Sequence, residues 1–288
     1  MADLLLQGVA NGLVTGAVYA LIAVGLTLVF GVMRIVNFAH GEFLMIAMYT
    51  TYLLSTFGKL HPYVAILVSV PFLFLLGAAT FKLLIQPLLA APEISQLLMT
   101  MGLGILLQNV ALLVFKADPL SVIVPWASNS VRVGPVAVAW TRLGAALVSL
   151  VVILGIYWLL RATDLGRMLR AAAQDRNAAQ LMGINVYRMY MLALAIGVAC
   201  LGVVGPVLVP WSYVNPEVGT VFTLTAFVIV VLGGMGSVSG AFFGGLIIGV
   251  VTAVGQVFLP GTYGLIPQYL VFILLLFFRP EGLFSGRI

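Results

Sequence analysis

The densest group of charged side chains in this chain lies in one segment, from Arg161 to Arg188. These residues (RATDLGRMLRAAAQDRNAAQLMGINVYR) hold seven of the 21 charged side chains and five of the 13 basic ones, and long apolar runs lie on both sides. An arginine-rich segment between apolar runs is typical of the cytoplasmic face of a membrane protein. The segment is therefore the best candidate surface on which another protein acts.

A second polar group follows the first apolar run and consists of Asn37, His40 and Glu42. It is expected in the first turn on the cytoplasmic side of the membrane. These side chains either cap the next helix and tie the turn together, or form an inner gate whose hydrogen bonds break during transport. Gln108 and Asn109 lie within a later apolar run, where contact with lipid is costly, so we expect them to face protein or a cavity. No carboxylate is expected clearly at mid-membrane, which disfavours a proton-driven pump.

The sequence offers no catalytic constellation. His40 and His61 are far apart and no Ser-His-Asp set or carboxylate pair can be argued from the spacing, so neither a metal site nor an enzyme is expected. No G-x-x-x-x-G-K-[ST] phosphate loop is present, and Gly233 to Gly240 lacks the lysine that holds nucleotide phosphates. Any ATP and Mg²⁺ must be bound by partner chains, and this chain needs no cofactor.

The composition indicates a membrane protein. Hydrophobic residues make up 63% of the chain and charged residues 7%, against about 25% charged in ordinary globular domains. The net charge of +5 comes from basic residues in turns between apolar runs, which fits positive-inside topology and not nucleic-acid binding. Cys200 is the single cysteine, so no disulfide framework exists.

The elements that must position these residues are apolar helices of about 20 residues, the length that crosses a bilayer. We predict an all-α, polytopic membrane protein in which residues 1–288 form a single transmembrane domain with eight or nine spans. The predicted spans are Leu5–Val29, Glu42–Phe57, Tyr63–Leu84, Ser95–Phe115, Arg142–Leu160, Met189–Val209, Val221–Leu232, Ala241–Phe258 and Ile266–Phe278. The seventh is short and ends in Gly233, Gly234, Met235, Gly236 and Ser237, so it could be a half-helix or a re-entrant segment.

The basic residues also predict the orientation. If the charged segment is cytoplasmic, alternation places nine basic residues inside and four outside, with the N-terminus outside and the C-terminus inside. The inside set is Arg34, Lys82, Arg161, Arg167, Arg170, Arg176, Arg188, Arg279 and Arg287, and the outside set is Lys59, Lys116, Arg132 and Arg142. This arrangement requires an odd number of crossings, and nine satisfies it.

The longest outside segment covers residues 116–141 and contains alternating residues around Gly134 and Pro135, which predicts a small hairpin. It either connects the helix ends or forms a docking surface for an extracytoplasmic partner.

Glycine pairs and triplets recur every four residues elsewhere in the chain, and such spacing lets helix backbones approach closely. The alternative is that they line a translocation path. These glycines are Gly8, Gly12 and Gly16, Gly240 with Gly244, and Gly245 with Gly249.

Within the charged segment, Asp175 is expected to cap a short helix from Arg176 to Met182, and Gly183 to end it. Upstream, Leu165, Met168, Leu169 and Ala172 share one helix face, while Arg167, Arg170 and Gln174 lie on others. Two interpretations are open. The pieces form an interfacial amphipathic helix that places arginines at lipid headgroups, or they form a rigid lever that receives force from a cytoplasmic subunit.

These residues resemble the cytoplasmic coupling loop of permeases from ABC importers of the branched-chain amino acid type. The residues that carry the resemblance, and that it assigns to ATPase coupling, are Gly166, Arg167, Arg170, Asp175, Arg176, Ala178, Ala179, Met182 and Gly183. Three further motifs resemble the same family in the same order: Ile35–Glu42, Tyr213–Pro216, and Leu232–Ser237 with Gly240. The turn at Ile35–Glu42 resembles the first, LivH-like, of two paralogous permeases.

The resemblance implies a multi-pass subunit of the bacterial inner membrane with several partners. These are a second, LivM-like permease, two cytoplasmic ATPases, an extracytoplasmic solute-binding protein and membrane lipid. The candidates for the path or its gates are Asn37, His40, Glu42, Gln108, Asn109, Gly233, Gly234, Gly236 and Ser237. The expected cargo is a branched-chain or related amino acid, while urea, short amides and aromatic acids are alternatives within the family. A secondary transporter or channel that works without ATPase partners is the competing function.

Overall fold

In a computed structural model, the described parts of the chain are residues 1–122, 124, 129–259 and 261–284. Most of them are helical. The α-helices are α1 (Ala2–Met33), α2 (His40–Thr56), α3 (Ile66–Thr80), α4 (Glu93–Phe115), α5 (Trp140–Ala162), α6 (Asp164–Gln174), α7 (Arg176–Leu181), α8 (Val186–Leu208), α9 (Val218–Gly233), α10 (Val238–Phe258) and α11 (Ile266–Phe278). Helix α3 continues through η1 (Phe81–Ile85) and η2 (Gln86–Leu88), and η3 (Gly261–Leu265) precedes α11.

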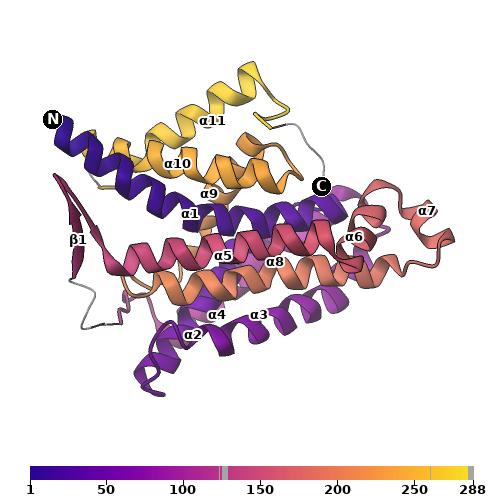
Figure 1. The fold of residues 1–288 in the computed structure, drawn as a ribbon. Helices are drawn as coiled ribbons and strands as arrows, with labels where there is room; N and C mark the ends of the chain where they lie inside the picture. The colour runs from indigo at the N-terminus through magenta and orange to yellow at the C-terminus, as the bar shows by residue number, and fades with distance from the viewer. Residues whose placement is uncertain (123, 125–128, 260, 285–288) are drawn as a thin grey trace.

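The long helices run side by side and give the molecule two distinct ends (Figure 1). The N-terminus lies at one end with the antiparallel hairpin of β1 (Ser130–Val133) and β2 (Val136–Ala139). Helices α6 and α7 and the last described residues lie at the opposite end. The predicted hairpin around Gly134 is therefore confirmed, and Gln7 joins it to α1 by bonding both the N–H (2.8 Å) and the C=O (2.7 Å) of Ala137.

Helices α1 and α8 form the centre of the core. The residues of α1 from Ala20 to Val29 are all buried, and α8 packs against α1, α2 and α3. Helix α1 packs on α10 through the glycines at four-residue spacing. A Cβ added at Gly12 would lie 2.6 Å from the Val250 Cα, and one at Gly16 would lie 2.8 Å from the Gly245 carbonyl oxygen. These glycines serve close helix packing, as their spacing predicts.

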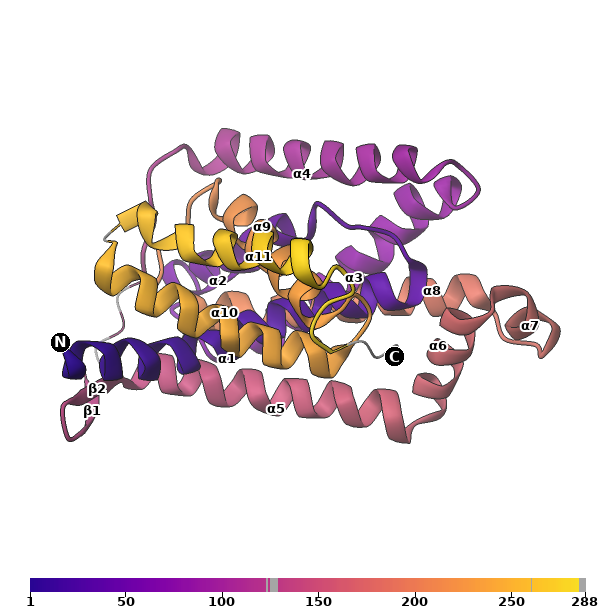
Figure 2. The ribbon, with the colours of Figure 1, turned by 90° about the horizontal axis from the view of Figure 1, so that it is seen from above.

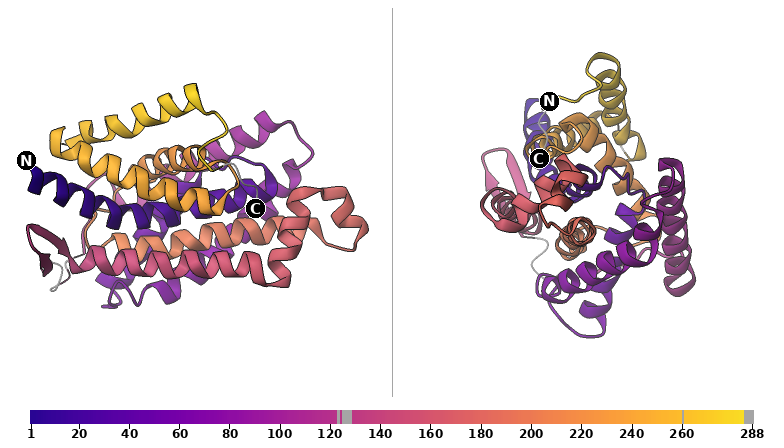
Figure 3. Two further views of the ribbon diagram at one scale, coloured as in Figure 1. Left: turned by 45° about the horizontal axis from the view of Figure 1, so that its top comes forward. Right: turned by 90° about the vertical axis from the view of Figure 1, so that its right-hand side faces the viewer.

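Helix α4 lies at the edge of the bundle, as the view in Figure 2 and the end view in Figure 3 show. Only 17% of its most apolar 18-residue window is buried. Among the described residues, six helical segments are long and apolar enough to cross a membrane: α1, α3 with η1 and η2, α4, α5, α8 and α10. The remaining predicted spans, Glu42–Phe57, Val221–Leu232 and Ile266–Phe278, correspond to the shorter helices α2, α9 and α11, whose short lengths the sequence also predicts.

The two ends of the bundle separate the basic residues as the sequence predicts. Of the nine expected on one side, Arg161, Arg167, Arg170, Arg176 and Arg188 lie in or next to α6 and α7, and Arg34 lines a cavity with Gln174 of α6, while Arg287 lies outside the described residues. Lys59, Lys116, Arg132 and Arg142 lie at the end that carries the hairpin and the N-terminus.

Candidate functional site

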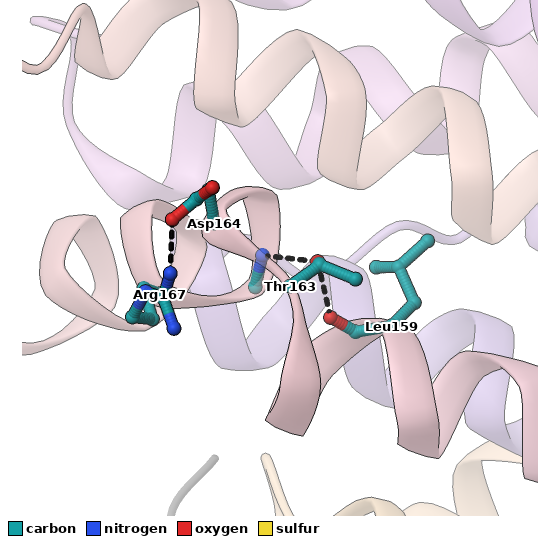
Figure 4. A network of polar contacts seen from close by, with 5 residues as sticks. Leu159, Thr163, Asp164 and Arg167 are labelled. Atoms are coloured by element: carbon teal, nitrogen blue, oxygen red, sulfur yellow. Dashed lines mark hydrogen bonds and ion pairs between the residues drawn. The ribbon is translucent and has the colours of Figure 1, made fainter.

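Helix α6 begins in a tight reversal after α5, drawn in Figure 4. The Thr163 hydroxyl accepts a hydrogen bond from the Gly166 N–H (3.1 Å) and donates one to the Leu159 carbonyl (2.6 Å). A Cβ at Gly166 would clash with the backbone carbonyls of Leu159 and Leu160. The arrangement therefore requires glycine at this position, while Arg167 pairs with Asp164 on the exposed side.

Helix α6 is amphipathic in the predicted register. Leu169 and Ala172 are buried against the ends of neighbouring helices, while Arg167 and Gln174 are exposed. Arg170 is half-buried, and its Nη1 atom has no hydrogen-bond partner among the described residues. Because α6 contacts α1, α5 and α8 at once, it is fixed to the bundle and does not lie free on the surface.

Helix α7 is short and capped at both ends, as predicted. The Asp175 carboxylate accepts from the N–H groups of Asn177 (2.8 Å) and Ala178 (3.0 Å). At the other end Gly183 has a φ of +81°, and the Ile184 N–H bonds the Ala179 carbonyl at 3.0 Å. This pattern ends a helix sharply. The helix itself ends at Leu181, one residue earlier than predicted.

The tip of this element extends beyond the bundle (Figure 1). Leu181 is 89% exposed and Met182 is 82% exposed, side by side at the end of α7. The Arg176 guanidinium donates to the Tyr187 hydroxyl (3.0 Å) at the start of α8 and stacks over its ring. Helix α7 is therefore a rigid projection tied to α8, with two adjacent apolar side chains in solvent.

The polar group at Asn37, His40 and Glu42 does not lie in a surface turn, which corrects the sequence-based placement. Arg34 adopts a left-handed conformation (φ 58°) and ends α1, after which the chain turns back along α1 and α2 begins inside the bundle. The His40 ring bonds the Ile22 carbonyl (3.0 Å), which lies well before the end of α1. Gly104, the central residue of α4, lies beside Glu42. The start of α2 is therefore halfway along the helices.

This start is held by contacts between distant segments. Thr100 of α4 donates to the Val36 carbonyl (3.2 Å) and accepts from the Phe38 N–H (3.3 Å). The Asn37 side chain accepts only from the Ala39 N–H (3.1 Å), before the helix begins. The first-turn N–H of Gly41 bonds the Thr223 hydroxyl of α9 at 2.8 Å. The polar residues thus tie the turn together, but the cap of α2 comes from α9 and not from Asn37, His40 or Glu42.

Glu42 is a buried carboxylate at this depth, with 4% of its surface exposed. Thr220, in the first turn of α9, donates to its Oε1 atom (3.3 Å), while Oε2 has no partner among the described residues. Gly41 and Gly219 let the starts of α2 and α9 touch, because a Cβ on either would collide with the other helix. The expectation that no carboxylate lies at mid-depth is therefore wrong, and Glu42 is a buried carboxylate of the kind that a proton-driven pump would use.

The other path candidates lie at two separate places. Gln108 and Asn109 line a cavity of about 300 Å³ with Asn215 and Glu217, and the exposed Asn109 side chain donates to the Ile105 carbonyl (2.8 Å). Gly233, Gly234, Gly236 and Ser237 form the turn between α9 and α10 at the α6–α7 end. Gly234 and Gly236 both have a φ of +93°, and Ser237 caps α10 by accepting from the Gly240 N–H. This segment is a tight turn and not a re-entrant loop, so these candidates do not meet Glu42.

A larger cavity lies next to that turn. It has a volume of about 500 Å³ and is enclosed by the end of α1, the end of α6 and the α9–α10 turn, with Arg34, Gln174 and Gly236 among its walls. It places the charged segment and the glycine-rich turn on the two sides of one space.

Sequence reasoning missed a polar cavity at the hairpin end. It has a volume of about 410 Å³, and its lining residues include Gln7, Asn11, Thr15, Tyr19, Arg142, Trp211, Thr252 and Gln256. Four of these residues recur every four positions along α1, a polar stripe within an apolar helix that the sequence does display.

Gln268 of α11 was also missed. It is fully buried and bonds Thr252 (3.1 Å) and Thr225 (3.5 Å), so it joins α11 to α10 and α9.

Comparisons with known proteins agree with this architecture. The sequence profile of the family described as branched-chain amino acid transport system / permease component matches residues 8–277. The chain is 32% identical to the high-affinity branched-chain amino acid transport system permease protein BraD of Pseudomonas aeruginosa, over 96% of this chain and 95% of that protein. It is 30% identical to LivH of Salmonella typhimurium, over 96% and 94% respectively.

A more distant relative is the probable branched-chain amino acid transport permease protein LivH of Methanocaldococcus jannaschii, which is 28% identical over 91% of this chain and 87% of that protein. No solved structure matches the chain. The family profile covers nearly the whole bundle, from the first turns of α1 to the end of α11. The chain therefore belongs to the family of branched-chain amino acid transport-system permease components of ABC importers.

Proposed function

We propose that this chain imports branched-chain or related amino acids as one half of a permease pair, and that cytoplasmic ATPases drive it through α7. The observation that carries the proposal is the capped, projecting α7 with Leu181 and Met182 exposed at its tip. Rigid helices transmit a displacement, and adjacent exposed apolar side chains are suited to a partner's pocket. Gly166, Arg167, Arg170, Asp175, Arg176, Ala178, Ala179, Met182 and Gly183 form or support this element.

The route for the displacement begins where α6 meets the bundle. Because α6 contacts α1, α5 and α8, a push on α7 reaches the ends of three long helices. The space between Gln174 and Gly236 lets α6 move relative to the α9–α10 turn. We infer that Gly233, Gly234, Gly236 and Ser237 act as a hinge there, and that the meeting point of α2 and α9 at Glu42 is the gate that opens in response.

This function sets the orientation and the partners. The α6–α7 end is cytoplasmic, the N-terminus is outside, and residues 116–141 face the solute-binding protein. A second homologous permease completes the path, two ATPases bind ATP and Mg²⁺, and the complex resides in the bacterial inner membrane. The names of the relatives support branched-chain amino acids as cargo. Urea, short amides and aromatic acids are the alternatives within the family.

The test is reconstitution with and without the partners. The chain is expressed with its neighbouring transport genes, purified by a tag on this chain, and placed in liposomes with ATP inside. We expect both ATPases to co-purify, and leucine uptake to require ATP and the solute-binding protein. Uptake by the purified chain alone, driven by an ion gradient and indifferent to ATP, would establish a secondary transporter instead.

A further inference from the structure

We propose that the cavity at the hairpin end is an outer binding site for the carboxylate of the transported amino acid, with Arg142 as its anion-binding group. The inference deepens the proposed function and rests on it for the orientation of the bundle. Arg142 lies in the first turn of α5, and Trp211 follows the end of α8. The two side chains enter the cavity together.

The first argument is that Arg142 has no counter-ion. The chain holds eight acidic side chains, all of them within the described residues, and none forms an ion pair with Arg142. The guanidinium carbon lies 5.1 Å from the centre of the Trp211 ring, and no hydrogen bond joins the guanidinium N–H groups to a described residue. Arg142 is half-buried, so an anion that reaches it meets an unpaired guanidinium partly shielded from water, where ion pairs are stronger than in bulk water. Its planar fork matches a carboxylate through two parallel hydrogen bonds.

The second argument is the chemistry of the remaining walls. Asn11, Thr15 and Tyr19 of α1 face Thr252 and Gln256 of α10 across the cavity. These side chains are uncharged and offer both donors and acceptors, so their oxygens are able to accept from an ammonium group. One fixed cation with several neutral acceptors suits a zwitterion better than a dianion. The volume of about 410 Å³ falls in the range of small-molecule sites, about 300–1,000 Å³.

The third argument is the depth of the cavity. Its walls extend along α1 from Leu4 to Tyr19, about 22 Å at a rise of 1.5 Å per residue. Beyond Tyr19, whose ring meets Phe222 edge-on (6.1 Å between centroids), α1 is buried without interruption from Ala20 to Val29. The cavity is therefore open at the outer end and closed at mid-depth. A small solute can occupy such a space more fully than a side chain of a docked protein.

The test measures binding to the complex of permeases and ATPases, without the solute-binding protein and without ATP, in phosphatidylcholine nanodiscs. Leucine and leucinamide, which lacks the carboxylate, are titrated by calorimetry, with Trp211 fluorescence as a second signal. We expect leucine to bind at least about tenfold more tightly than leucinamide, because a charge-assisted pair is lost with the amide. Arg142→Gln should weaken leucine binding by a similar factor and leave leucinamide unchanged, while Arg142→Lys should retain part of the preference.

Lys59→Gln is the matched control, since Lys59 is an exposed outer cation that lies outside the cavity. Equal binding of leucine and leucinamide, or unchanged leucine binding in Arg142→Gln, would overturn the proposal. Loss of wild-type leucine binding when anionic lipid replaces phosphatidylcholine would also overturn it, by assigning Arg142 to the headgroup of an anionic lipid.

The same preparations separate this inference from the proposed function. If the wild-type complex transports leucine with ATP and the Arg142→Gln complex does so with the same KM, the proposed importer function stands and the proposed binding site is wrong. If the wild-type chain neither retains ATPases nor transports leucine, the proposed importer function is wrong, whatever the binding data show.

Discussion

At the scale of single residues, the least expected feature is the start of α2 halfway along the bundle. The Gly41 N–H is one of the free amides of a helix start, and Thr223 supplies its acceptor from α9. The contact also brings Glu42 next to Thr220, so two short helices begin at one point. Discontinuous helices of this kind occur at the binding and gating sites of membrane transporters.

We predict that Thr223→Val destabilises the permease by about 1–3 kcal/mol, the usual cost of leaving a buried N–H without a partner. The volume of the side chain hardly changes, so the loss reports the Gly41 bond. Thermal unfolding of the detergent-purified chain measures it. Thr223→Ser keeps the hydroxyl and should unfold near the wild-type temperature. Equal melting of Thr223→Val and wild type would show that the contact between α2 and α9 adds nothing to stability.

The sequence predicts these residues as a polar group but not their depth. Asn37, His40 and Glu42 follow an apolar run that ends at Arg34, and a surface turn is the usual place for such residues. What moves them inward is the backbone turn at Arg34 together with the bonds from Thr100 to residues 36 and 38. Those bonds join positions more than 60 residues apart, so no local pattern contains them. The spacing of Gln7, Asn11, Thr15 and Tyr19, in contrast, was visible and predicts a polar face on α1.

At the scale of elements, the α1–α10 contact depends on glycines that the sequence identified correctly by their spacing. A Cβ at Gly245 would lie 2.5 Å from the Cα of Ala20, so the backbones must separate to admit it. We predict that Gly245→Ala lowers the unfolding free energy by about 1–3 kcal/mol, the cost of overpacking. Gly155→Ala on α5 meets no atom within 4 Å and should be neutral or slightly stabilising in the same thermal assay. Equal effects of both changes would mean that α1 and α10 do not pack this closely.

The caps of α7 allow a test of the element that is independent of the bundle. We predict that Asp175→Ala weakens α7 by about 0.5–2 kcal/mol, because the amides of Asn177 and Ala178 lose their acceptor. The bundle should keep its unfolding temperature, since α7 projects from it, while leucine uptake and leucine-stimulated ATP hydrolysis fall together. Asp175→Asn retains a capping oxygen and should restore most of both activities. Normal uptake by Asp175→Ala complex would show that an ordered α7 is not needed.

The secondary structure of this segment was predictable because its signals are local. Asp175 precedes the helix, Gly183 follows it, and the apolar face of α6 repeats every three to four residues. The projection of α7 beyond the bundle was not predictable, since it depends on how α6 is fixed by α1, α5 and α8. The short lengths of α2, α9 and α11 were predictable, because the apolar runs that form them are themselves short.

At the scale of the whole molecule, the two ends of the bundle predict opposite accessibilities in the cell. Cys200 is buried and bonds the Ile196 carbonyl, so Cys200→Ala gives a background without cysteine. In that background, Lys59→Cys should react with a membrane-impermeant maleimide in intact spheroplasts, and Gln180→Cys only after the membrane is opened. Both positions are exposed. The reverse pattern would invert the orientation and place α7 outside, where no ATPase is present.

The central claim, that ATPases act on this permease through the tip of α7, is tested most directly by cross-linking from the tip. A photoreactive amino acid is placed at Leu181, or at the outward-facing Trp140 as the control, and the assembled complex is illuminated and analysed by mass spectrometry. We expect adducts between position 181 and an ATPase subunit, none from position 140, and loss of ATP-driven leucine uptake in Leu181→Asp/Met182→Asp. The opposite result has two parts: a complex that retains its ATPases gives no adduct from position 181, and the double variant shows normal uptake. That result would contradict coupling through the tip of α7.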